Sequence, residues 1–135
     1  MRPPLNLLIV SSCLETKRAL TRIIWGLPIN TYTSSSIGQA WEVLNSRFVD
    51  LILCDEELPD GAYPEFLAAV CAEHRVTRFV VLLASDEWED YVQALKLGVG
   101  DALLASYLPT DLELILIRAS RESSQQEMLR MAAGA

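Results

Sequence analysis

Short apolar runs recur along the chain, and the segments between them carry apolar residues at helical spacing. The runs cover residues 5–10, 49–55 and 78–84, with a weaker run at 101–105 and a more polar one at 29–34. Short continuous apolar runs are typical of strands buried on both faces, as in a parallel sheet. The pattern therefore predicts five strands, of which residues 29–34 form an edge strand.

The segments between these runs follow the i, i+3, i+4, i+7 spacing of amphipathic helices. Ser12, Ser36 and Thr110 are each followed three residues later by Glu or Gln, which predicts capped helix starts. Pro28 is expected to end the first helix, and Pro64 suits the first turn of the third. The apolar positions are Leu20, Ile23, Ile24 and Leu27 in the first helix, Ile37, Ala40, Trp41 and Leu44 in the second, Phe66, Leu67 and Val70 in the third, Trp88, Tyr91, Val92 and Leu95 in the fourth, and Leu112, Ile115, Leu116 and Ala119 in the last.

Strands and helices alternate strictly in this prediction, which indicates an α/β domain with one parallel sheet and helices on both faces. Right-handed crossover connections then give a three-layer sandwich. In such folds, binding sites form beyond the carboxyl ends of the strands, where the strand order switches. Asp55 ends one of the apolar runs and is therefore the first candidate for a functional side chain.

The 135 residues are 51% hydrophobic, which is enough for one compact domain with its own core. We expect this domain to span residues 1–120, and residues 121–135 to form a polar helical tail or linker of the kind that leads into an output domain. No apolar run approaches the length of a membrane span. The net charge of −7 argues against direct contact with nucleic acid, because phosphate contacts need Lys and Arg.

The remaining special residues favour structural over catalytic interpretations. The three cysteines lack metal-type spacing and fit a reducing cytoplasm, where we expect the protein to reside. His74 is the only histidine, which argues against a metal centre or a Ser-His-Asp triad. Trp25, Trp41 and Trp88 lie near apolar neighbours and are expected to pack in the core.

Two segments carry a family resemblance. DLILCDEELPDG, residues 50–61, places Asp55 at a strand end with Pro59 four residues later, and EDYVQALKLGVGDALL, residues 89–104, has Gly98 at a helix end. Over about residues 5–120 the chain resembles the receiver domains of two-component response regulators, whose CheY-like fold is flavodoxin-like. The resemblance implies that Asp55 is the candidate phosphoacceptor of a phosphorelay and that Pro59 lies in the loop beside it.

The chain departs from that family at the acid pair and at the lysine. The resemblance implies two adjacent acids at the end of the first strand, which help to bind Mg²⁺, but the sequence has Ser11 and Ser12 there. Ser12 has a structural interpretation as well, as the cap of the first helix. The resemblance also implies a lysine at the end of the fifth strand, where this chain has Ala105.

The family's hydroxyl position is a further departure. A Thr or Ser is implied at the end of the fourth strand, where it binds the incoming phosphoryl oxygen. Counting back from Gly98 without gaps places Leu83 at this position, and a short deletion would place Ala84 or Ser85 there. Only Ser85 among the three retains a hydroxyl.

These departures bear on chemistry because phosphoryl transfer depends on positioning and on neutralising charge. Mg²⁺ does much of that work through hard oxygen ligands, and Asp55 is the only family-type carboxylate left. Glu57 is either an assisting ligand or an exposed loop residue. We therefore hypothesise an atypical receiver, not an enzyme, that signals by protein contacts with weak or no Mg²⁺-dependent phosphorylation. It is expected to need no cofactor, with Mg²⁺ binding only if the Asp55 site is active.

Two alternatives stay open from the sequence. One is a slow but genuine phosphoacceptor at Asp55. The other is a flavodoxin-like cofactor binder or small enzyme that uses the same sheet edge. That class needs a phosphate-binding loop after the first strand, where SSCLET offers hydroxyls but no glycine.

The last helix carries more apolar residues than one buried face needs, because Leu114 and Ile117 widen its stripe. Either the helix is broadly buried, or these two residues mark a partner surface. The resemblance implies association, including homodimers, through the fourth helix, fifth strand and fifth helix. The expected partners are a sensor histidine kinase or another signalling protein and a covalently linked output domain, with neither nucleic acid nor membrane.

Overall fold

The computed structural model describes residues 4–73 and 76–134, so that His74 lies outside the described residues. Its sheet strands are β1 Leu5–Val10, β2 Ile29–Ser34, β3 Leu51–Asp55, β6 Arg78–Leu82 and β7 Asp101–Leu103. The helices are α1 Leu14–Ile24, α2 Ile37–Ser46, α3 Tyr63–Glu73, α4 Trp88–Leu97 and α5 Pro109–Gly134, and a hairpin of β4 Glu57–Leu58 and β5 Gly61–Ala62 precedes α3.

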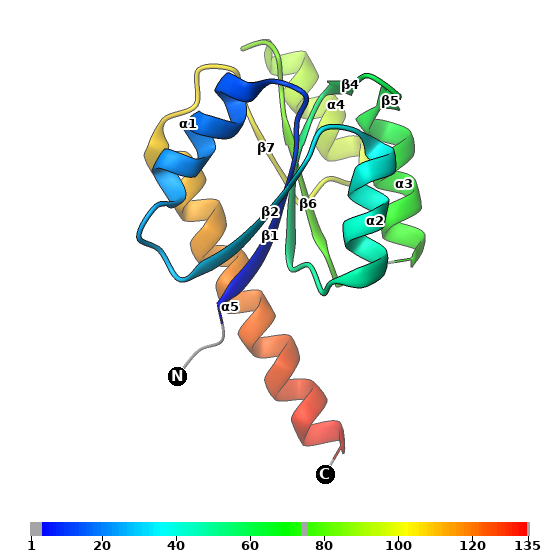
Figure 1. The fold of residues 1–135 in the computed structure, drawn as a ribbon, viewed down its shortest axis with the longest axis vertical. Helices are drawn as coiled ribbons and strands as arrows, with labels where there is room; N and C mark the ends of the chain where they lie inside the picture. Colours follow the sequence, from blue (N-terminus) through cyan, green and yellow to red (C-terminus); the bar gives the residue numbers. More distant parts are fainter. Residues whose placement is uncertain (1–3, 74–75, 135) are drawn as a thin grey trace.

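The five sheet strands are all parallel and lie in the order β2-β1-β3-β6-β7 (Figure 1). One apolar cluster joins the sheet to α2, α3 and α4, and a second joins the opposite face to α1 and α5. The predicted three-layer α/β sandwich is therefore confirmed. Residues 29–34 form the edge strand that their polarity indicated.

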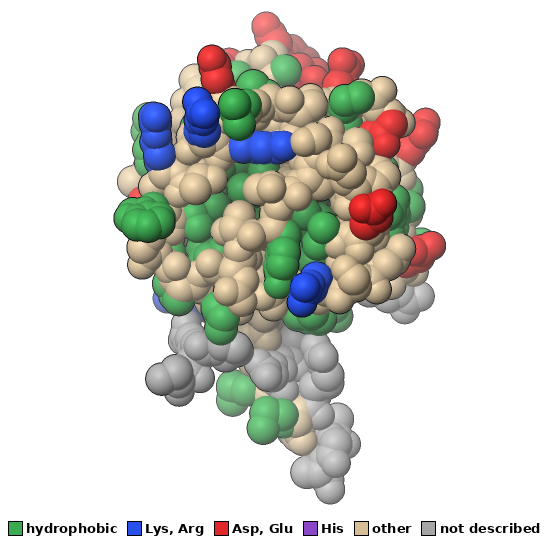
Figure 2. All heavy atoms as spheres, viewed as in Figure 1, with side chains coloured by type: hydrophobic (Ala, Val, Ile, Leu, Met, Phe, Trp, Pro, Cys, Tyr) green, Lys and Arg blue, Asp and Glu red, His purple; other side chains and the backbone are tan. Residues whose placement is uncertain are grey.

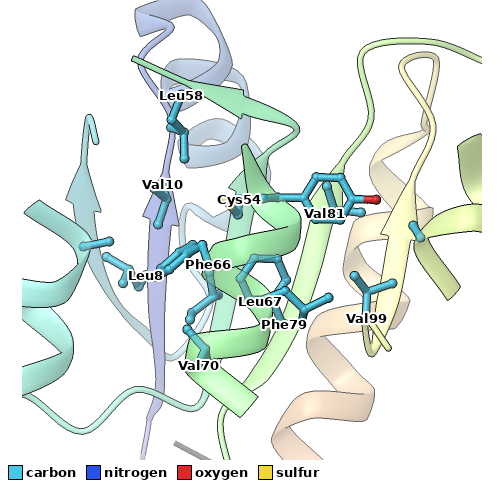
Figure 3. Close-up of a cluster of buried hydrophobic side chains, with 14 of the residues drawn as sticks. Leu8, Val10, Cys54, Leu58, Phe66, Leu67, Val70, Phe79, Val81 and Val99 are labelled. Carbon is cyan, nitrogen blue, oxygen red and sulfur yellow. The ribbon is translucent and has the colours of Figure 1, made fainter. Parts of the chain in front are cut away.

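Both faces of the sheet are buried, which explains the continuous apolar runs. Along β1, Leu8 and Val10 enter the cluster under α2 and α3, whereas Leu7 and Ile9 enter the cluster under α1 and α5. Figure 3 shows the first of these clusters, in which Phe66 of α3 lies over the strands. The Phe66 ring meets two other rings edge-on, with centroid distances of 5.6 Å to Trp41 and 5.5 Å to Phe79.

The observed elements are shorter than the sequence pattern in several places. β3 begins at Leu51, β6 ends at Leu82 and β7 ends at Leu103. The predicted runs were longer because apolar residues just outside the ladder, such as Leu83, are buried without belonging to a strand. α1 ends at Ile24, before Leu27. The hairpin β4–β5 was not predicted, since strands of two residues give no alternation signal.

One of the three predicted helix caps is confirmed. Ser36 caps α2, because its hydroxyl accepts a hydrogen bond of 3.1 Å from the Gln39 amide. The prediction for Ser12 is wrong: the residue before α1 is Cys13, and its side chain makes no capping bond. The prediction for Thr110 is also wrong, since α5 begins one residue earlier, at Pro109.

Acidic residues lie next to the starts of two other helices, α5 and α4. The Asp111 carboxylate accepts from the Leu108 amide at the start of α5, at 2.8 Å. Glu87 is the residue that precedes α4, and its side chain makes no capping hydrogen bond. Gly98 ends α4 with a φ of 102°, a left-handed conformation that favours glycine, so the predicted helix end is confirmed.

The packing prediction is right for Trp41 and wrong for the other two tryptophans. Trp41 packs against the core, but Trp25 follows the last turn of α1 and is 85% exposed. Trp88 is also exposed and stacks on Tyr91, with ring centroids 5.0 Å apart. The fully buried residue of α4 is Ala94; of the predicted apolar stripe Tyr91 packs against the core, whereas Trp88 and Leu95 are exposed.

α5 is the longest helix, and Figure 1 shows its second half projecting past the body of the domain. The predicted stripe is confirmed, since Leu112, Ile115, Leu116 and Ala119 are all buried. Leu114 and Ile117 are 52% and 50% exposed, so the helix is not broadly buried. In the part of the chain that the structure describes, no helix is long and apolar enough to cross a membrane.

The cap assignments predict unequal effects of two similar substitutions. Ser36→Ala should lower the free energy of unfolding by about 1 kcal/mol, because it leaves the Gln39 amide without its acceptor. Ser12→Ala should change it by less than about 0.5 kcal/mol, as for an exposed residue without a capping role. Urea unfolding of both variants beside the wild type measures the difference, and equal losses would contradict the assignments.

Candidate functional site

Asp55 is the last residue of β3 and lies at the carboxyl edge of the sheet. It pairs with Leu82, the last residue of β6, and its side chain is half-buried. The strand places Asp55 at this edge because the four residues before it, Leu51 to Cys54, are all buried in the two apolar clusters. Figure 2 shows acidic side chains gathered along the top of the molecule, which is the edge at which the parallel strands end.

The end of β1 places two serines beside this aspartate. Ser11 is fully buried, its amide donates to the Ser34 carbonyl at 3.0 Å, and its hydroxyl accepts from the Cys13 amide at 3.1 Å. Ser12 is exposed. Ser11, rather than Ser12, therefore shapes the turn into α1.

The environment of Asp55 acts on its pKa in two directions. Burial raises the pKa of the carboxyl above its ordinary value of 3.8, and this is the largest effect. Hydrogen bonding from the Ser11 side chain and the Ser12 backbone, together with the positive charge of Lys17, opposes the increase. Lys17 projects from α1, where its ammonium group donates to the Ser35 hydroxyl at 2.6 Å.

An open cleft of about 610 Å³ lies beside Asp55. Its apolar wall comes from the ends of β6 and β7, and Leu83, Ala84 and Ala105 all line it. Ser85 is not among the lining residues: its hydroxyl donates to the Asp90 carboxylate at 2.7 Å and accepts from the Glu87 amide at 3.3 Å. The one hydroxyl among the three candidates at this position is thus engaged at the start of α4.

The polar lining of the cleft is mostly acidic: Glu15, Glu56 and Glu57 line it together with Asp55, beside Thr16 and Tyr107. Glu57 is exposed and begins the hairpin, and Pro59 lies exposed at its turn. Glu56 is half-buried, and its pKa is raised first by burial and then by the charges of Asp90 and Glu57. These carboxylates give the cleft a negative potential.

Asp60, in the turn of the same hairpin, connects the site loop to a neighbouring helix. Its carboxylate oxygens accept from the Ile37 amide at 2.9 Å and the Gly38 amide at 3.0 Å, at the start of α2. These bonds hold the pKa of Asp60 below its ordinary value. The loop after Asp55 is therefore attached at its far end, which restricts where Glu57 and Pro59 lie.

Comparison with solved structures gave many close matches. The signal receiver domain of an HD domain-containing protein from Pseudomonas fluorescens Pf-5 superposes with a TM-score of 0.82 at 22% identity, covering 94% of this chain and 95% of that one. The signal receiver domain of a putative Luxo repressor protein from Vibrio parahaemolyticus gives 0.84 at 16% identity, covering 96% and 98%. No family model and no curated protein sequence matched.

The chain has the fold of a response-regulator receiver domain. A third match bears on the metal: the receiver domain of a sensor histidine kinase from Pseudomonas aeruginosa PAO1, with a magnesium ion coordinated in its active site cleft. It superposes with a TM-score of 0.76 at 20% identity and covers 87% of this chain and 98% of that one.

The residues of this chain do not fit a magnesium ion at the equivalent edge of the receiver fold. The first strand supplies a buried hydroxyl, Ser11, whose oxygen already accepts a hydrogen bond, and an exposed one, Ser12. Among the described residues, no three or more His, Cys, Asp or Glu side chains are grouped so that they can hold a metal ion. Mg²⁺ prefers several oxygen ligands, carboxylates above all, in octahedral geometry, and these donors do not supply them.

The sequence pattern identified Asp55, and the resemblance drew attention to Glu57, Leu83, Ala84 and Ala105, all of which line this cleft. Glu56, which also lines the cleft, and Lys17, whose charge acts on Asp55, were missed. Glu56 carries a signal in hindsight, because it directly follows the strand end and its amide still bonds to the Leu82 carbonyl at 3.2 Å. Lys17 belongs to a helix that follows another strand, and only the tertiary arrangement brings its charge near Asp55.

The raised pKa of Asp55 predicts a pH-dependent effect of neutralising it. The native state binds the Asp55 proton more tightly than the unfolded state, so ionisation lowers stability as pH rises from 3.8 through the native pKa. Asp55→Asn should therefore raise Tm at neutral pH, and this gain should vanish below pH 3.8. Thermal unfolding at both pH values, with Glu57→Gln as a control for one lost charge, measures it. A gain that is independent of pH would contradict the assigned cause.

Proposed function

We propose that the chain is an atypical receiver module of two-component signalling that acts by protein contacts, with weak or no Mg²⁺-dependent phosphorylation of Asp55. The observation that carries the proposal is the composition of the cleft beside this carboxylate. Leu83, Ala84 and Ala105 line the cleft in place of a hydroxyl and a lysine. Ser11 and Ser12, which act on the Asp55 carboxyl by hydrogen bonding, stand in place of an acid pair.

Electrostatics supports the proposal. A phosphoryl group that approaches Asp55 is an anion, and its transfer needs cations or donors that neutralise the developing charge. The cleft offers it the carboxylates of Glu15, Glu56 and Glu57, and its other polar lining residues, Thr16 and Tyr107, carry no positive charge. Without a metal these carboxylates repel the donor, so the geometry that remains at Asp55 favours a non-enzymatic binding role.

The proposed partners are proteins. We propose that this domain receives its input from a sensor histidine kinase or another signalling protein. Residues 121–135 are proposed to lead into an output domain. The similar structures include the receiver domain of an HD domain-containing protein and that of a sensor histidine kinase, so the same fold occurs there beside other domains.

One observation favours a second candidate, a slow phosphoacceptor at Asp55. The charge of Lys17 already acts on the Asp55 carboxyl, so a cation is available near the site although position 105 is alanine. This lysine lies on α1, and its ammonium group also donates a hydrogen bond to the Ser35 hydroxyl. The flavodoxin-like cofactor binder draws no comparable support, since residues 11–16 after β1 contain no glycine.

The two candidates differ in the product that a small phosphoryl donor gives. After incubation with acetyl phosphate and Mg²⁺, the proposal predicts that the intact mass of the wild-type protein stays unchanged. A slow phosphoacceptor would gain the mass of one phosphoryl group over hours, and Asp55→Asn would abolish the gain. Stoichiometric, Asp55-dependent addition within minutes would overturn the proposal.

A restored variant shows whether the missing groups are the cause. Ser11→Asp and Ser12→Asp return the acid pair, and Ala105→Lys returns the cation at the cleft wall. The triple variant is expected to bind Mg²⁺ and to accept phosphate at Asp55 under conditions in which the wild type does not. Adding Asp55→Asn to the triple variant supplies the control, because any labelling that persists occurs elsewhere.

A further inference from the structure

α5 carries two stripes on opposite sides. Successive residues of an α-helix are turned by about 100°, which places the buried stripe of Leu112, Ile115, Leu116 and Ala119 on one side. The same rotation places Leu114 and Ile117 on the opposite side, where both are half exposed. The first stripe packs against the sheet, and no helix or strand of the described residues covers the second.

The outer stripe continues along the projecting half of the helix. Counting on from Leu114 in alternating steps of three and four reaches the positions that we call the α5 seam: Leu114, Ile117, Arg121, Ser124, Met128 and Met131. The two methionines are strongly exposed. Alternating steps of three and four are the spacing of a and d positions in a coiled coil.

We propose that the α5 seam pairs with the seam of a second copy of this chain, forming a parallel two-stranded coiled coil that runs from the domain into the tail. The inference goes beyond the proposed function, because it assigns a register, an orientation and a partner that do not depend on Asp55. It also extends the expected surface at Leu114 and Ile117 to residues that lie beyond the domain body.

Charge complementarity favours a second copy as the occupant. In this register Glu113 is a g position and Arg118 the e position five residues later, the pair that meets across a parallel dimer. Glu113 is exposed, and the Arg118 side chain is 60% exposed, with only a 3.4 Å contact to Asp101. A two-fold axis forms this Glu–Arg pair twice. The next flanking pair, Ser120 and Gln125, is uncharged and adds no repulsion.

Contacts on the inner side hold the helix in an orientation that leaves the seam outward. The Arg78 guanidinium donates to Glu122 at 2.6 and 2.7 Å, and the Ser123 hydroxyl donates to the Asp50 carboxylate at 2.7 Å. Glu122 and Ser123 continue the buried stripe past Ala119. Two domains paired through their seams therefore lie on opposite sides of the helix pair and do not compete for it.

Arg121 and Ser124 are the polar residues in the middle of the seam, and of the two only Arg121 is at an a position. A single polar side chain at an a position weakens a coiled coil while fixing its register. Arg121→Leu is therefore expected to tighten the dimer, a gain that nonspecific association of exposed side chains does not predict.

Adjacent residues supply a matched test of the seam. Met128 and Leu129 are both 70% exposed, but only Met128 lies on the seam. In sedimentation equilibrium over a wide concentration range, Met128→Glu should raise the dimer dissociation constant about tenfold or more, and Leu129→Glu should change it little. Leu114→Glu with Ile117→Glu should leave a folded monomer. A wild type that is monomeric at every concentration, or equal effects at 128 and 129, would overturn the proposal.

Cross-linking tests the orientation. In a background of Cys13→Ser and Cys71→Ser, which removes the two exposed thiols, Ser124→Cys places a thiol on the seam. In a parallel pair the two introduced thiols face each other, so mild oxidation should give a disulfide-linked dimer, whereas Gln125→Cys should give much less. Association without cross-linking at 124 would overturn the parallel register. Because no phosphoryl donor is used, either result is independent of the role of Asp55.

Discussion

The fold depends on covering both faces of one parallel sheet with apolar side chains. β1 and β3 lie in the middle of the sheet, and their residues alternate between a cluster under α2, α3 and α4 and a cluster under α1 and α5. Burial of this kind stabilises a domain by about 25 cal/mol for each Å² of apolar surface. It also fixes the strand register, since a slip of one residue would exchange the two clusters.

That constraint determines where chemistry is possible. Parallel strands end at the same edge, so the residues at or just after the carboxyl ends of β1, β3, β6 and β7 converge there, whether they are polar or apolar. In this chain the convergent residues are Ser11, Asp55, Leu83 and Ala105, an arrangement with one carboxylate and no fixed cation among them. This composition is the basis of the proposal that Asp55 serves binding rather than phosphoryl transfer.

The sequence predicted the elements well because burial on both faces leaves a local signal, a short continuous apolar run. It located Asp55 because a strand end is visible in that signal. It failed where the deciding contact is distant, since Asp60 caps α2 from more than twenty residues away. It also failed at the end of β1, where Ser11, and not the exposed Ser12, accepts from the Cys13 amide. The prediction that Trp25 packs in the core also failed, since an apolar residue after a helix end carries no local signal of its exposure.

The cleft and the tail of α5 lie at opposite ends of the same strands. Asp55 ends β3, while Asp50, just before β3, accepts from Ser123 of α5, and Arg78, which begins β6, binds Glu122. A buried strand is a stiff connection, so an event at Asp55 reaches the tail only by moving a close-packed core. On the function proposed above, no new charge is fixed at the cleft to trigger such a movement. α5 would then keep one orientation, and its partners would recognise the proposed seam and its neighbours rather than a switched state.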